Sequence, residues 1–251
     1  MRAVITGAAG GIGAAIARRL AGTRERPRLL LIDVAEDGLA RTAGETEEAG
    51  AKTVTMACDL STSDAGDAVI AEAERALGGL DALLSNAGIV RPGRLGNHGT
   101  EAYDLVFAVN ARATWLLARA AFPLLREARG CVVATGSLAA EHPTPDIGSY
   151  SPSKAALVMI VKQLAYEWGP YGIRCNCVSP GAVRTPMTEP KYGDPASASR
   201  RAREAVIPLR RVAEPAEIAA AVDFLSSPAA SYVTGVNLPV DGGWSTALCR
   251  P

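Results

Sequence analysis

The chain has 251 residues, of which 48% are apolar and 21% are charged, and its 26 Lys and Arg residues balance 26 Asp and Glu residues. That length suits one large α/β domain, and that composition supports a sizeable buried core and excludes an intrinsically disordered chain. The sequence has neither a basic excess nor a basic run, so nucleic acid is excluded as an expected partner.

Short apolar runs alternate with longer amphipathic segments along the chain. Strands are predicted at residues 3–6, 28–32, 53–57, 82–85, 131–135, 173–178 and 235–239, and helices at 11–22, 36–49, 62–77, 101–127, 150–168 and 214–226. Several strands are continuous runs of β-branched residues or leucine, as expected when helices cover both faces of a parallel sheet. The pattern predicts an α/β, doubly wound fold with a seven-stranded parallel sheet, and no linker or repeat divides the single domain expected over 1–251.

The segment TGAAGGIG, residues 6–13, connects the first predicted strand to the first predicted helix. Gly7, Gly11 and Gly13 permit a tight turn, close approach of the backbone to a ligand, and a helix N-terminus directed at a pyrophosphate. Glycine triplets also occur in ordinary connections, so the residues alone predict little. Their position between that strand and that helix favours dinucleotide binding.

The second predicted strand, RLLLID, ends at Asp33, twenty residues after Gly13. A carboxylate at this position accepts hydrogen bonds from the ribose hydroxyls of adenosine and repels a 2′-phosphate. Gly10 and Val34 occupy the neighbouring positions where a basic residue would bind that phosphate. The sequence therefore favours NAD over NADP, with a simple strand-end cap as the alternative for Asp33.

Tyr150 and Lys154 lie four residues apart in GSYSPSK, residues 148–154, where a helix is predicted to begin. Residues at i and i+4 share one face of a helix, so the phenol and the ammonium can project into one site. A nearby ammonium stabilises phenolate, and we expect it to lower the pKa of Tyr150 towards neutrality. The pair alone is weak support for a site, because this spacing often arises by chance.

The cysteines and the apolar runs bear on the compartment. The count of five cysteines is odd, and the chain opens on the strand-like MRAVITG, so neither a disulfide framework nor a signal peptide is expected. All but Cys249 are expected to be small buried side chains, and neither histidine lies at ligand spacing from Cys175 and Cys177, so no metal site is expected. The longest apolar run, residues 155–161, is too short to span a membrane. We expect a cytoplasmic protein without a membrane partner.

Eight short motifs follow one another between Arg2 and about Trp244 in the order and spacing of a known family. They are TGAAGGIG at 6–13, CDL at 58–60, SNAG at 85–88, VNARA at 109–113, TGS at 135–137, YSPSK at 150–154, SPGAVRT at 179–185 and VDGGW at 240–244. In these motifs the sequence resembles the single-domain short-chain dehydrogenases/reductases. Ser85 stands where that family has asparagine, which is a mild departure. The resemblance implies a Rossmann fold and hydride transfer between a nicotinamide cofactor and a secondary alcohol or ketone.

The resemblance also implies roles for single residues. Tyr150 would be the acid/base, Lys154 would lower its pKa and bind the nicotinamide ribose, and Ser137 would donate to the substrate oxygen. Asn110 would hold a water that links Lys154 to solvent. A helix cap at Ser137, a satisfied core amide at Asn110 and a surface aromatic at Tyr150 are the structural alternatives. The implied cofactor contacts are Gly7, Gly10, Gly11, Ile12, Gly13, Asp33, Val34, Asp59, Leu60, Asn86, Ala87, Gly88, Tyr150, Lys154, Pro180, Gly181, Val183 and Thr185.

The substrate is less well defined. The residues expected to line its pocket are Ser137, Ala139, His142, Tyr150, Ala182 and Met187. They are mixed in polarity and indicate only a small to medium secondary alcohol or ketone. The segment 183–213 resembles the mobile substrate loop of the family. Its arginines at 200, 201, 203, 210 and 211 are predicted to form a solvated face, and contact with an anionic substrate is the alternative.

The predicted helices 101–127 and 150–168 are apolar nearly all round. Such a helix is typical of burial between its own sheet and a partner subunit, and a lipid pocket is the alternative. In the resembled family these two helices pair across a twofold axis, which implies a homotetramer or a homodimer.

Three other functions remain open. A 3-oxoacyl thioester reductase acting on a carrier-bound chain is disfavoured by Asp33 and by Tyr171, where carrier-binding relatives tend to have a basic residue. A catalytically silent NAD-binding regulatory protein is disfavoured because Ser137, Tyr150 and Lys154 are all present. An epimerase or dehydratase of the extended family would need a larger C-terminal substrate domain.

Overall fold

In the computed structural model, which describes residues 1–246, seven parallel strands form one sheet in the order β3-β2-β1-β4-β5-β6-β7. The strands are β1 (Arg2–Thr6), β2 (Arg28–Asp33), β3 (Lys52–Ala57), β4 (Ala82–Ser85), β5 (Cys131–Thr135), β6 (Arg174–Pro180) and β7 (Asn237–Val240). The predicted seven-stranded parallel sheet is confirmed. The strand order reverses between β1 and β4, and ligands of such sheets bind beside the carboxyl ends of the strands at this point.

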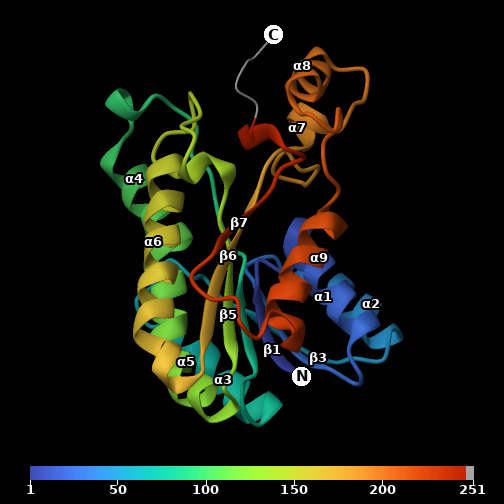
Figure 1. Ribbon diagram of the computed structural model, residues 1–251, viewed down its shortest axis with the longest axis vertical. Helices are drawn as coiled ribbons and strands as arrows, with labels where there is room; N and C mark the ends of the chain where they lie inside the picture. Colours follow the sequence, from blue (N-terminus) through green and yellow to red (C-terminus); the bar gives the residue numbers. More distant parts are fainter. Residues whose placement is uncertain (247–251) are drawn as a thin grey trace.

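Helices cover both faces of the sheet, as predicted (Figure 1). They are α1 (Gly11–Thr23), α2 (Glu36–Glu48), α3 (Ala65–Leu77), α4 (Thr100–Phe107), α5 (Ala113–Ala128), α6 (Tyr150–Trp168), α7 (Glu189–Tyr192), α8 (Ala198–Val206) and α9 (Pro215–Ser226). One face carries α1, α2 and α9, and the other carries α3 to α6, while α7 and α8 lie beyond the end of the sheet opposite the N-terminus.

The sheet separates two hydrophobic cores, because successive side chains of a strand point to opposite faces. In β2, Leu30 and Ile32 belong to the core shared with α3, α5 and α6. Leu29 and Leu31 belong to the core shared with α1 and α9. All four side chains are completely buried. This burial on both faces explains why the strand is a continuous apolar run rather than an alternating one.

The helix predicted at 101–127 contains a π turn, Ala108–Arg112, between α4 and α5. Such a turn inserts one residue into the helix and often lies at a functional site. The sequence was interpreted as one continuous helix over 101–127, and its apolar periodicity did not indicate this turn. By length and composition alone, the whole stretch Thr100–Ala128 could cross a membrane, contrary to our expectation, but 56% of its most apolar window is buried inside the fold. It packs against the sheet and α3 as a core helix.

The segment predicted as a substrate loop at 183–213 contains two helices that the sequence did not indicate. The hydroxyl of Ser197 caps α8 by accepting a hydrogen bond from the backbone N–H of Arg200 at 3.2 Å. A small separate core lies beneath these helices and consists of Ala182, Tyr192, Ile207 and Val212, packed against Trp244. We call residues 183–213 the lid. Its helices were missed because α7 and α8 are only four and nine residues long, and the arginine-rich sequence of α8 was interpreted as a solvated segment.

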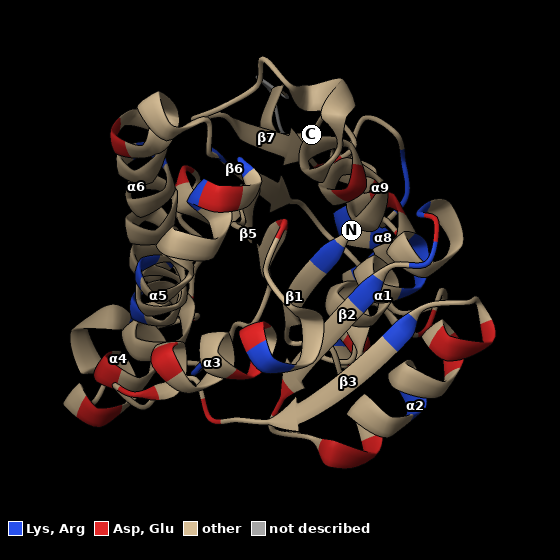
Figure 2. Ribbon diagram, turned by 90° about the horizontal axis from the view of Figure 1, so that it is seen from below, with Lys and Arg blue, Asp and Glu red and all other residues tan. Residues whose placement is uncertain are grey.

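Charged residues lie at the helix surfaces and at the strand starts seen from below in Figure 2. The neighbouring strands β1, β2 and β3 begin with Arg2, Arg28 and Lys52, which are paired in register. Arg2 forms an ion pair with Asp81 at 2.6 Å. The basic end of the sheet is therefore opposite to the carboxyl ends of its strands.

Smaller differences concern element boundaries and cysteines. The helix predicted from residue 62 begins at Ala65, after the N-cap Asp64. β6 and β7 begin one and two residues later than predicted. Cys131, Cys175 and Cys177 are 2%, 0% and 1% exposed, as expected for small buried side chains, whereas Cys58 was also expected to be buried and is only half-buried. Cys249 lies outside the described residues.

Candidate active site

A cavity of about 310 Å³ opens at the carboxyl ends of the strands, where the strand order reverses. It brings together most of the residues that the sequence predicts for the site. Its lining consists of Gly7, Gly10, Gly11, Ile12, Asp33, Asn86, Ala87, Gly88, Thr135, Gly136, Ser137, Tyr150, Lys154, Pro180, Gly181, Val183, Thr185, Pro186, Met187 and Thr188.

The glycine-rich turn between β1 and α1 forms one end of this cavity. Gly7 and Gly11 have φ values of +68° and +53°, which side chains rarely permit. A Cβ atom on Gly13 would lie 2.0 Å from the carbonyl oxygen of Gly7, so the helix packs directly on the turn. Gly10 caps α1 without a side chain, which leaves the first N–H groups of the helix accessible to an anion. This geometry fits the pyrophosphate of a dinucleotide.

Asp33 lies at the end of β2 and faces the same cavity. One carboxylate oxygen accepts a hydrogen bond from the backbone N–H of Ala9 at 3.1 Å. The other accepts from the N–H groups of Val34 and Ala35 at 2.8 and 3.2 Å. Asp33 is therefore both a strand-end cap and a cavity residue, and the two interpretations of the sequence are compatible. Its carboxylate is held in place while further lone pairs remain available.

Two threonines that the sequence analysis did not single out hold the SNAG segment in place. The hydroxyl of Thr6 accepts hydrogen bonds from the N–H groups of Asn86 and Ala87 at 2.9 and 3.0 Å. The hydroxyl of Thr135 donates to the side-chain oxygen of Asn86 at 3.0 Å. Thr6 is the first residue of the motif TGAAGGIG, and Thr135 is the first residue of the motif TGS. Their positions in these motifs could have identified them as residues of the site. Their bonds fix Asn86 between β1 and β5 at the edge of the cavity.

Lys154 is 2% exposed, and its ammonium donates a hydrogen bond to the carbonyl of Thr135 at 2.7 Å. Burial lowers the pKa of Lys154 to about 8, because an ammonium loses its hydration in this environment. Gly88 leaves room for it, since a Cβ atom there would lie 3.3 Å from the lysine nitrogen. Lys154 is thus a buried cation whose charge is held by a backbone carbonyl.

Tyr150 is the first residue of α6 and is half-buried. Burial raises its pKa, and a hydrogen bond with Ser137 opposes that increase. We expected the ammonium of Lys154 to lower this pKa, and that expectation is wrong for this structure. The lysine nitrogen lies 5.8 Å from the centre of the tyrosine ring and donates to Thr135, so it does not pair with the phenol oxygen.

Ser137 and Asn110 were both predicted to belong to the site, and each also makes hydrogen bonds that support the local structure. Ser137 begins a short 3₁₀ turn and accepts a hydrogen bond from the N–H of Ala139 at 3.1 Å. Asn110 is completely buried in the π turn and exchanges hydrogen bonds of 2.8 and 3.0 Å with the backbone of Ile89. Its amide also donates to the hydroxyl of Ser153 at 3.0 Å. Asn110 therefore joins the loop after β4 to α6, and its predicted role in holding a water stays a prediction.

Several predicted residues lie outside the cavity lining. Asp59 is exposed, and its carboxylate accepts from the N–H of Ser61 at 2.8 Å. Leu60 is 6% exposed and belongs to the core, and Ala182 is 7% exposed and packs beneath the lid. His142 is exposed. Ala139 lines a second cavity between residues 93–95 and 139–155. These residues share motifs or loops with the site, but their side chains point elsewhere.

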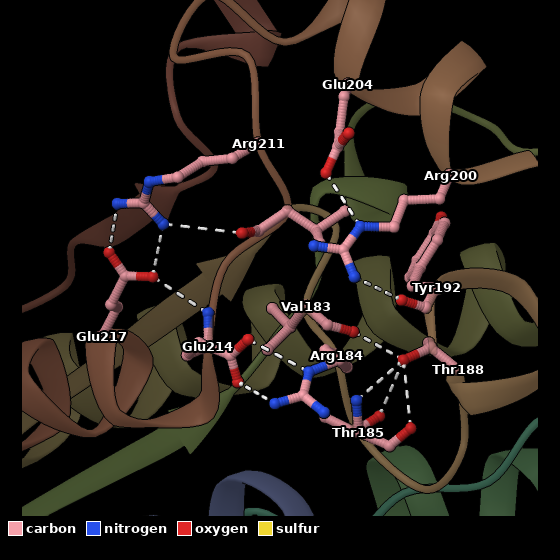
Figure 3. Close-up of polar contacts among 11 residues, drawn as sticks. Val183, Arg184, Thr185, Thr188, Tyr192, Arg200, Glu204, Arg211, Glu214 and Glu217 are labelled. Carbon is pink, nitrogen blue, oxygen red and sulfur yellow. Dashed lines mark hydrogen bonds and ion pairs between the residues drawn. The ribbon is translucent and has the colours of Figure 1, made fainter. Parts of the chain in front are cut away.

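Polar contacts hold the two ends of the lid, where it leaves and rejoins the rest of the fold, as shown in Figure 3. Thr188 accepts a hydrogen bond from the N–H of Thr185 at 2.9 Å and donates to the carbonyl of Val183. Arg184 forms a two-pronged ion pair with Glu214, with both distances 3.0 Å. The backbones of the two ends also pair, because Val183 and Ala213 form a parallel bridge. These contacts hold Val183 and Thr185 at the cavity.

The lid arginines were predicted to form a solvated face, and the structure shows that several of them instead contact other groups of the protein. Arg200 donates to Glu204 and to the carbonyl of Tyr192, both at 2.9 Å, and its side chain is only 17% exposed. Arg211 pairs with Glu217 at 2.5 Å, and the guanidinium of Arg203 lies 4.1 Å above the ring of Trp244. These arginines therefore stabilise the lid itself, and the sequence did not indicate the contacts with Tyr192, Glu217 and Trp244 because those partners lie on other segments.

Comparison with known proteins identifies the family of this chain. The family model described as enoyl-(acyl carrier protein) reductase matches residues 7–245. The 2,5-dichloro-2,5-cyclohexadiene-1,4-diol dehydrogenase LinX of Sphingobium indicum is 34% identical over 247 residues, which are 98% of this chain and 96% of that protein. The 2,3-dihydro-2,3-dihydroxybenzoate dehydrogenase of Bacillus subtilis is 36% identical over 248 residues, which cover 96% and 94% of the two chains.

Solved structures agree over the same length. Levodione reductase has a TM-score of 0.91 and 33% identity, with 98% of this chain and 97% of that chain covered. The 3-ketoacyl-(acyl-carrier-protein) reductase of Brucella melitensis, solved in complex with NADH, has a TM-score of 0.86 and 32% identity over 97% of both chains. The chain therefore belongs to the short-chain dehydrogenase/reductase family and is an oxidoreductase that uses a nicotinamide cofactor.

Proposed function

We propose that this enzyme interconverts a secondary alcohol on a ring and the corresponding ketone, with NAD as its cofactor and Tyr150 as its acid/base. The observation that carries the proposal is one cavity that is lined by Ser137, Tyr150 and Asp33 together. Lys154 and the glycine-rich turn line the same cavity. Chemistry and cofactor binding are thus assigned to a single continuous space.

The chain's own residues account for the proton movements of the reaction. A bound nicotinamide ring supplies the hydride chemistry, accepting a hydride during alcohol oxidation and giving one during ketone reduction. During oxidation, the phenolate form of Tyr150 takes the proton from the substrate hydroxyl and becomes the phenol, and during reduction the phenol gives its proton to the same oxygen. Ser137 donates a hydrogen bond to that oxygen while negative charge develops there. Asp33, the glycine-rich turn, Val183, Thr185 and Lys154 would hold the cofactor.

The preference for NAD rests on Asp33. Its carboxylate is fixed by three backbone N–H groups, so it cannot easily turn away from a 2′-phosphate. Val34 is 67% exposed and uncharged, and Gly10 has no side chain to neutralise that phosphate. Like charges at about 4 Å repel by roughly 1 kcal/mol in water and by several kcal/mol where solvent is excluded. These features support NAD(H) as the preferred cofactor.

The substrate class is inferred from the relatives together with the cavity wall. The names of the two relatives described above place their reacting hydroxyl groups on six-membered rings. In this chain, apolar groups of Val183, Pro186 and Met187 line the cavity with Ser137 and Tyr150. Apolar walls beside a hydrogen-bonding pair suit a compact ring that carries a hydroxyl or a carbonyl.

A substrate panel tests this proposal. Cyclic and linear secondary alcohols and ketones would be assayed by nicotinamide absorbance with both cofactors. We expect cyclohexanediols and cyclohexanones to be converted faster than linear compounds of equal size, and NAD(H) to give the higher kcat/KM. Turnover restricted to linear compounds would contradict the ring assignment, and equal kcat/KM for both cofactors would contradict the role of Asp33.

Reduction of a 3-oxoacyl thioester is the second candidate, favoured by the 3-ketoacyl-(acyl-carrier-protein) reductase structure. Tyr171, which counted against it, lies beneath the guanidinium of Arg126 at 4.9 Å, so a positive charge is present there after all. Acetoacetyl-CoA in the same panel separates the two functions. Faster NADPH-dependent reduction of that thioester than of any cyclic ketone would favour the second candidate.

We further propose that the enzyme works in the cytoplasm as a homotetramer or a homodimer. Cys58, Cys131, Cys175 and Cys177 are free thiols, as is usual in reducing compartments. Large apolar side chains remain exposed on α5 and α6, which supports association through these helices.

A further inference from the structure

Two loops on the substrate side of the site are joined to one another. The loop after β4 and the loop before α6 form a short parallel bridge between Gly93 and Ile147. The N–H of Gly93 donates to the carbonyl of Asp146 at 3.1 Å, and the N–H of Gly148 donates to the carbonyl of Gly93 at 2.7 Å. The second of these loops ends at Tyr150, so whatever holds the bridge also bears on the proposed acid/base.

An imidazole fills the space between these loops. A Cβ atom on Gly148 would lie 2.3 Å from Cε1 and 2.6 Å from Nδ1 of His98. A Cβ atom on Gly93 would lie 3.5 Å from the same Nδ1. Both glycines have positive φ values, +55° and +144°. The backbone thus provides a cradle without side chains that the ring of His98 occupies.

His98 reaches from this cradle to the start of α6. Its Nε2 lies 3.3 Å from the hydroxyl of Ser149, a side chain that is completely buried and directly precedes Tyr150. The carbonyl of Ser149 accepts from the N–H of Ser153 at 2.9 Å. The hydroxyl of Ser153 donates to the carbonyl of Tyr150 at 2.7 Å and accepts from Asn110. The first turn of α6 is therefore held by His98 on one side and by Asn110 on the other.

We infer that His98 is a positioning residue for Tyr150, acting through Ser149. This inference rests on the proposed role of Tyr150 as acid/base. His98 does not line the cavity with Ser137 and Lys154, so it contacts neither the proposed substrate site nor the cofactor site. A shift of about 1 Å at a reacting group can reduce a rate about 100-fold, so loosening this turn reduces turnover without removing any reacting group.

A set of variants of the full-length enzyme tests this inference. His98→Leu removes the hydrogen bond and His98→Gln can restore it, while Ser149→Ala removes the partner. His142→Leu is the matched control, because His142 is the other histidine of the chain and is exposed in the loop before α6. The measured quantities are kcat and KM for the best alcohol of the panel, the Kd for NADH by fluorescence, and Tm.

We expect His98→Leu and Ser149→Ala to lower kcat at least about tenfold through displacement of the phenol, with the Kd for NADH within about twofold. His98→Gln should recover kcat to within about threefold, and the double variant His98→Leu/Ser149→Ala should be no slower than His98→Leu, because both changes break one interaction. A purely structural role would lower Tm and leave the kcat of the folded protein unchanged.

Wild-type kcat in folded His98→Leu would overturn the inference, as would a His98→Gln variant as slow as His98→Leu. If His98→Leu does not fold, wild-type kcat in Ser149→Ala has the same meaning. Tyr150→Phe separates this failure from that of the proposed function. An active Tyr150→Phe variant would remove the proposed function, whereas an inactive Tyr150→Phe beside a fully active His98→Leu would remove only the role of His98.

Discussion

Burial sets the charge state of Lys154 and makes it depend on pH. Its pKa falls from 10.5 to about 8 in the fold, because the buried ammonium keeps one carbonyl partner and loses its hydration. Between about pH 8 and pH 10.5, Lys154 binds more protons in the unfolded chain than in the folded chain. Its contribution to the free energy of unfolding therefore rises with pH in this range. Below pH 8 its charge opposes folding, and above pH 10.5 that cost disappears.

The variant Lys154→Met removes this pH-dependent contribution. The free energy of unfolding of the wild type should therefore rise relative to that of Lys154→Met by about 2 kcal/mol between pH 7 and pH 10. The raised pKa values of Tyr150, Cys131 and Cys175 do not depend on Lys154, so they act in both proteins and cancel in the difference. Urea unfolding at a series of pH values measures the difference, and Lys162→Met, which removes an exposed lysine of α6, is the control. A difference that does not grow with pH would contradict the assigned burial cost.

The expected preference for NAD(H) over NADP(H) also depends on single residues. A repulsion of about 2–3 kcal/mol corresponds to roughly 30–150-fold discrimination, and we expect NAD(H) to be preferred by at least about tenfold in kcat/KM. Asp33→Ala combined with Val34→Arg removes the repulsion and adds a positive charge at an exposed position. That double variant should narrow or reverse the preference. An unchanged ratio of kcat/KM for the two cofactors would show that the carboxylate does not face the 2′ position.

Single residues of the site could be predicted where a short motif specifies both the residue type and its position in the chain. Asp33, Ser137, Tyr150 and Lys154 were located from short patterns, and all four line one cavity. Their bonding partners were not predictable in the same way. The contact of Lys154 with the carbonyl of Thr135 joins α6 to β5, and only the three-dimensional arrangement shows that the ammonium turns towards it.

At the scale of elements, the contact between α1 and the turn before it depends on one glycine. A Cβ atom on Gly13 would lie 2.0 Å from a backbone oxygen, which cannot move without opening the turn. We expect Gly13→Ala to lower the free energy of unfolding by more than about 2 kcal/mol and to weaken NADH binding. Gly44→Ala in α2 is the control, because nothing lies within 4 Å of its Cβ position, and it should be neutral or stabilising by up to about 1 kcal/mol. Chemical unfolding and NADH fluorescence measure both effects, and a Gly13→Ala variant as stable as Gly44→Ala would contradict the packing.

Elements were predictable where a long apolar pattern packs on the sheet, and short elements away from the sheet were missed. The seven strands and the helices that cover them have continuous or amphipathic apolar patterns, and the sequence located each of them within a few residues. The helix α8 has only nine residues and lies in an arginine-rich segment, where Arg200 binds the carbonyl of Tyr192 within the lid and Arg203 stacks on Trp244. The π turn at Ala108–Arg112 escapes detection for a different reason, because one inserted residue does not change composition.

At the scale of the whole molecule, α5 and α6 expose large apolar groups that an isolated chain would present to water. Trp115, Met159 and Tyr166 are 43%, 62% and 84% exposed. A groove lined by Phe107, Trp115 and Ile160 runs between the two helices. We therefore expect light scattering at micromolar protein concentration to give the mass of a dimer or a tetramer.

Substitution of the same surface tests where that association occurs. Trp115→Glu combined with Met159→Lys places charges on α5 and α6 and should shift the protein to a smaller species. Tyr232→Lys is the control, because Tyr232 is fully exposed but lies outside these helices. A wild-type protein that is a monomer at micromolar concentration would contradict the expected assembly, and an unchanged mass for the double variant would place the interface elsewhere.

In the proposed function, one tyrosine phenol moves the proton while the rest of the cavity binds the cofactor. Tyr150→Phe removes only the oxygen that is hydrogen-bonded with Ser137 and leaves the glycine-rich turn, Asp33 and Lys154 in place. The direct test measures kcat on the best alcohol of the panel beside the Kd for NADH of the same variant. We predict that kcat falls at least about 100-fold, the loss expected when a general acid/base is removed, while the Kd for NADH stays within about threefold of the wild type. A Tyr150→Phe enzyme that retains wild-type kcat would contradict this account of the site.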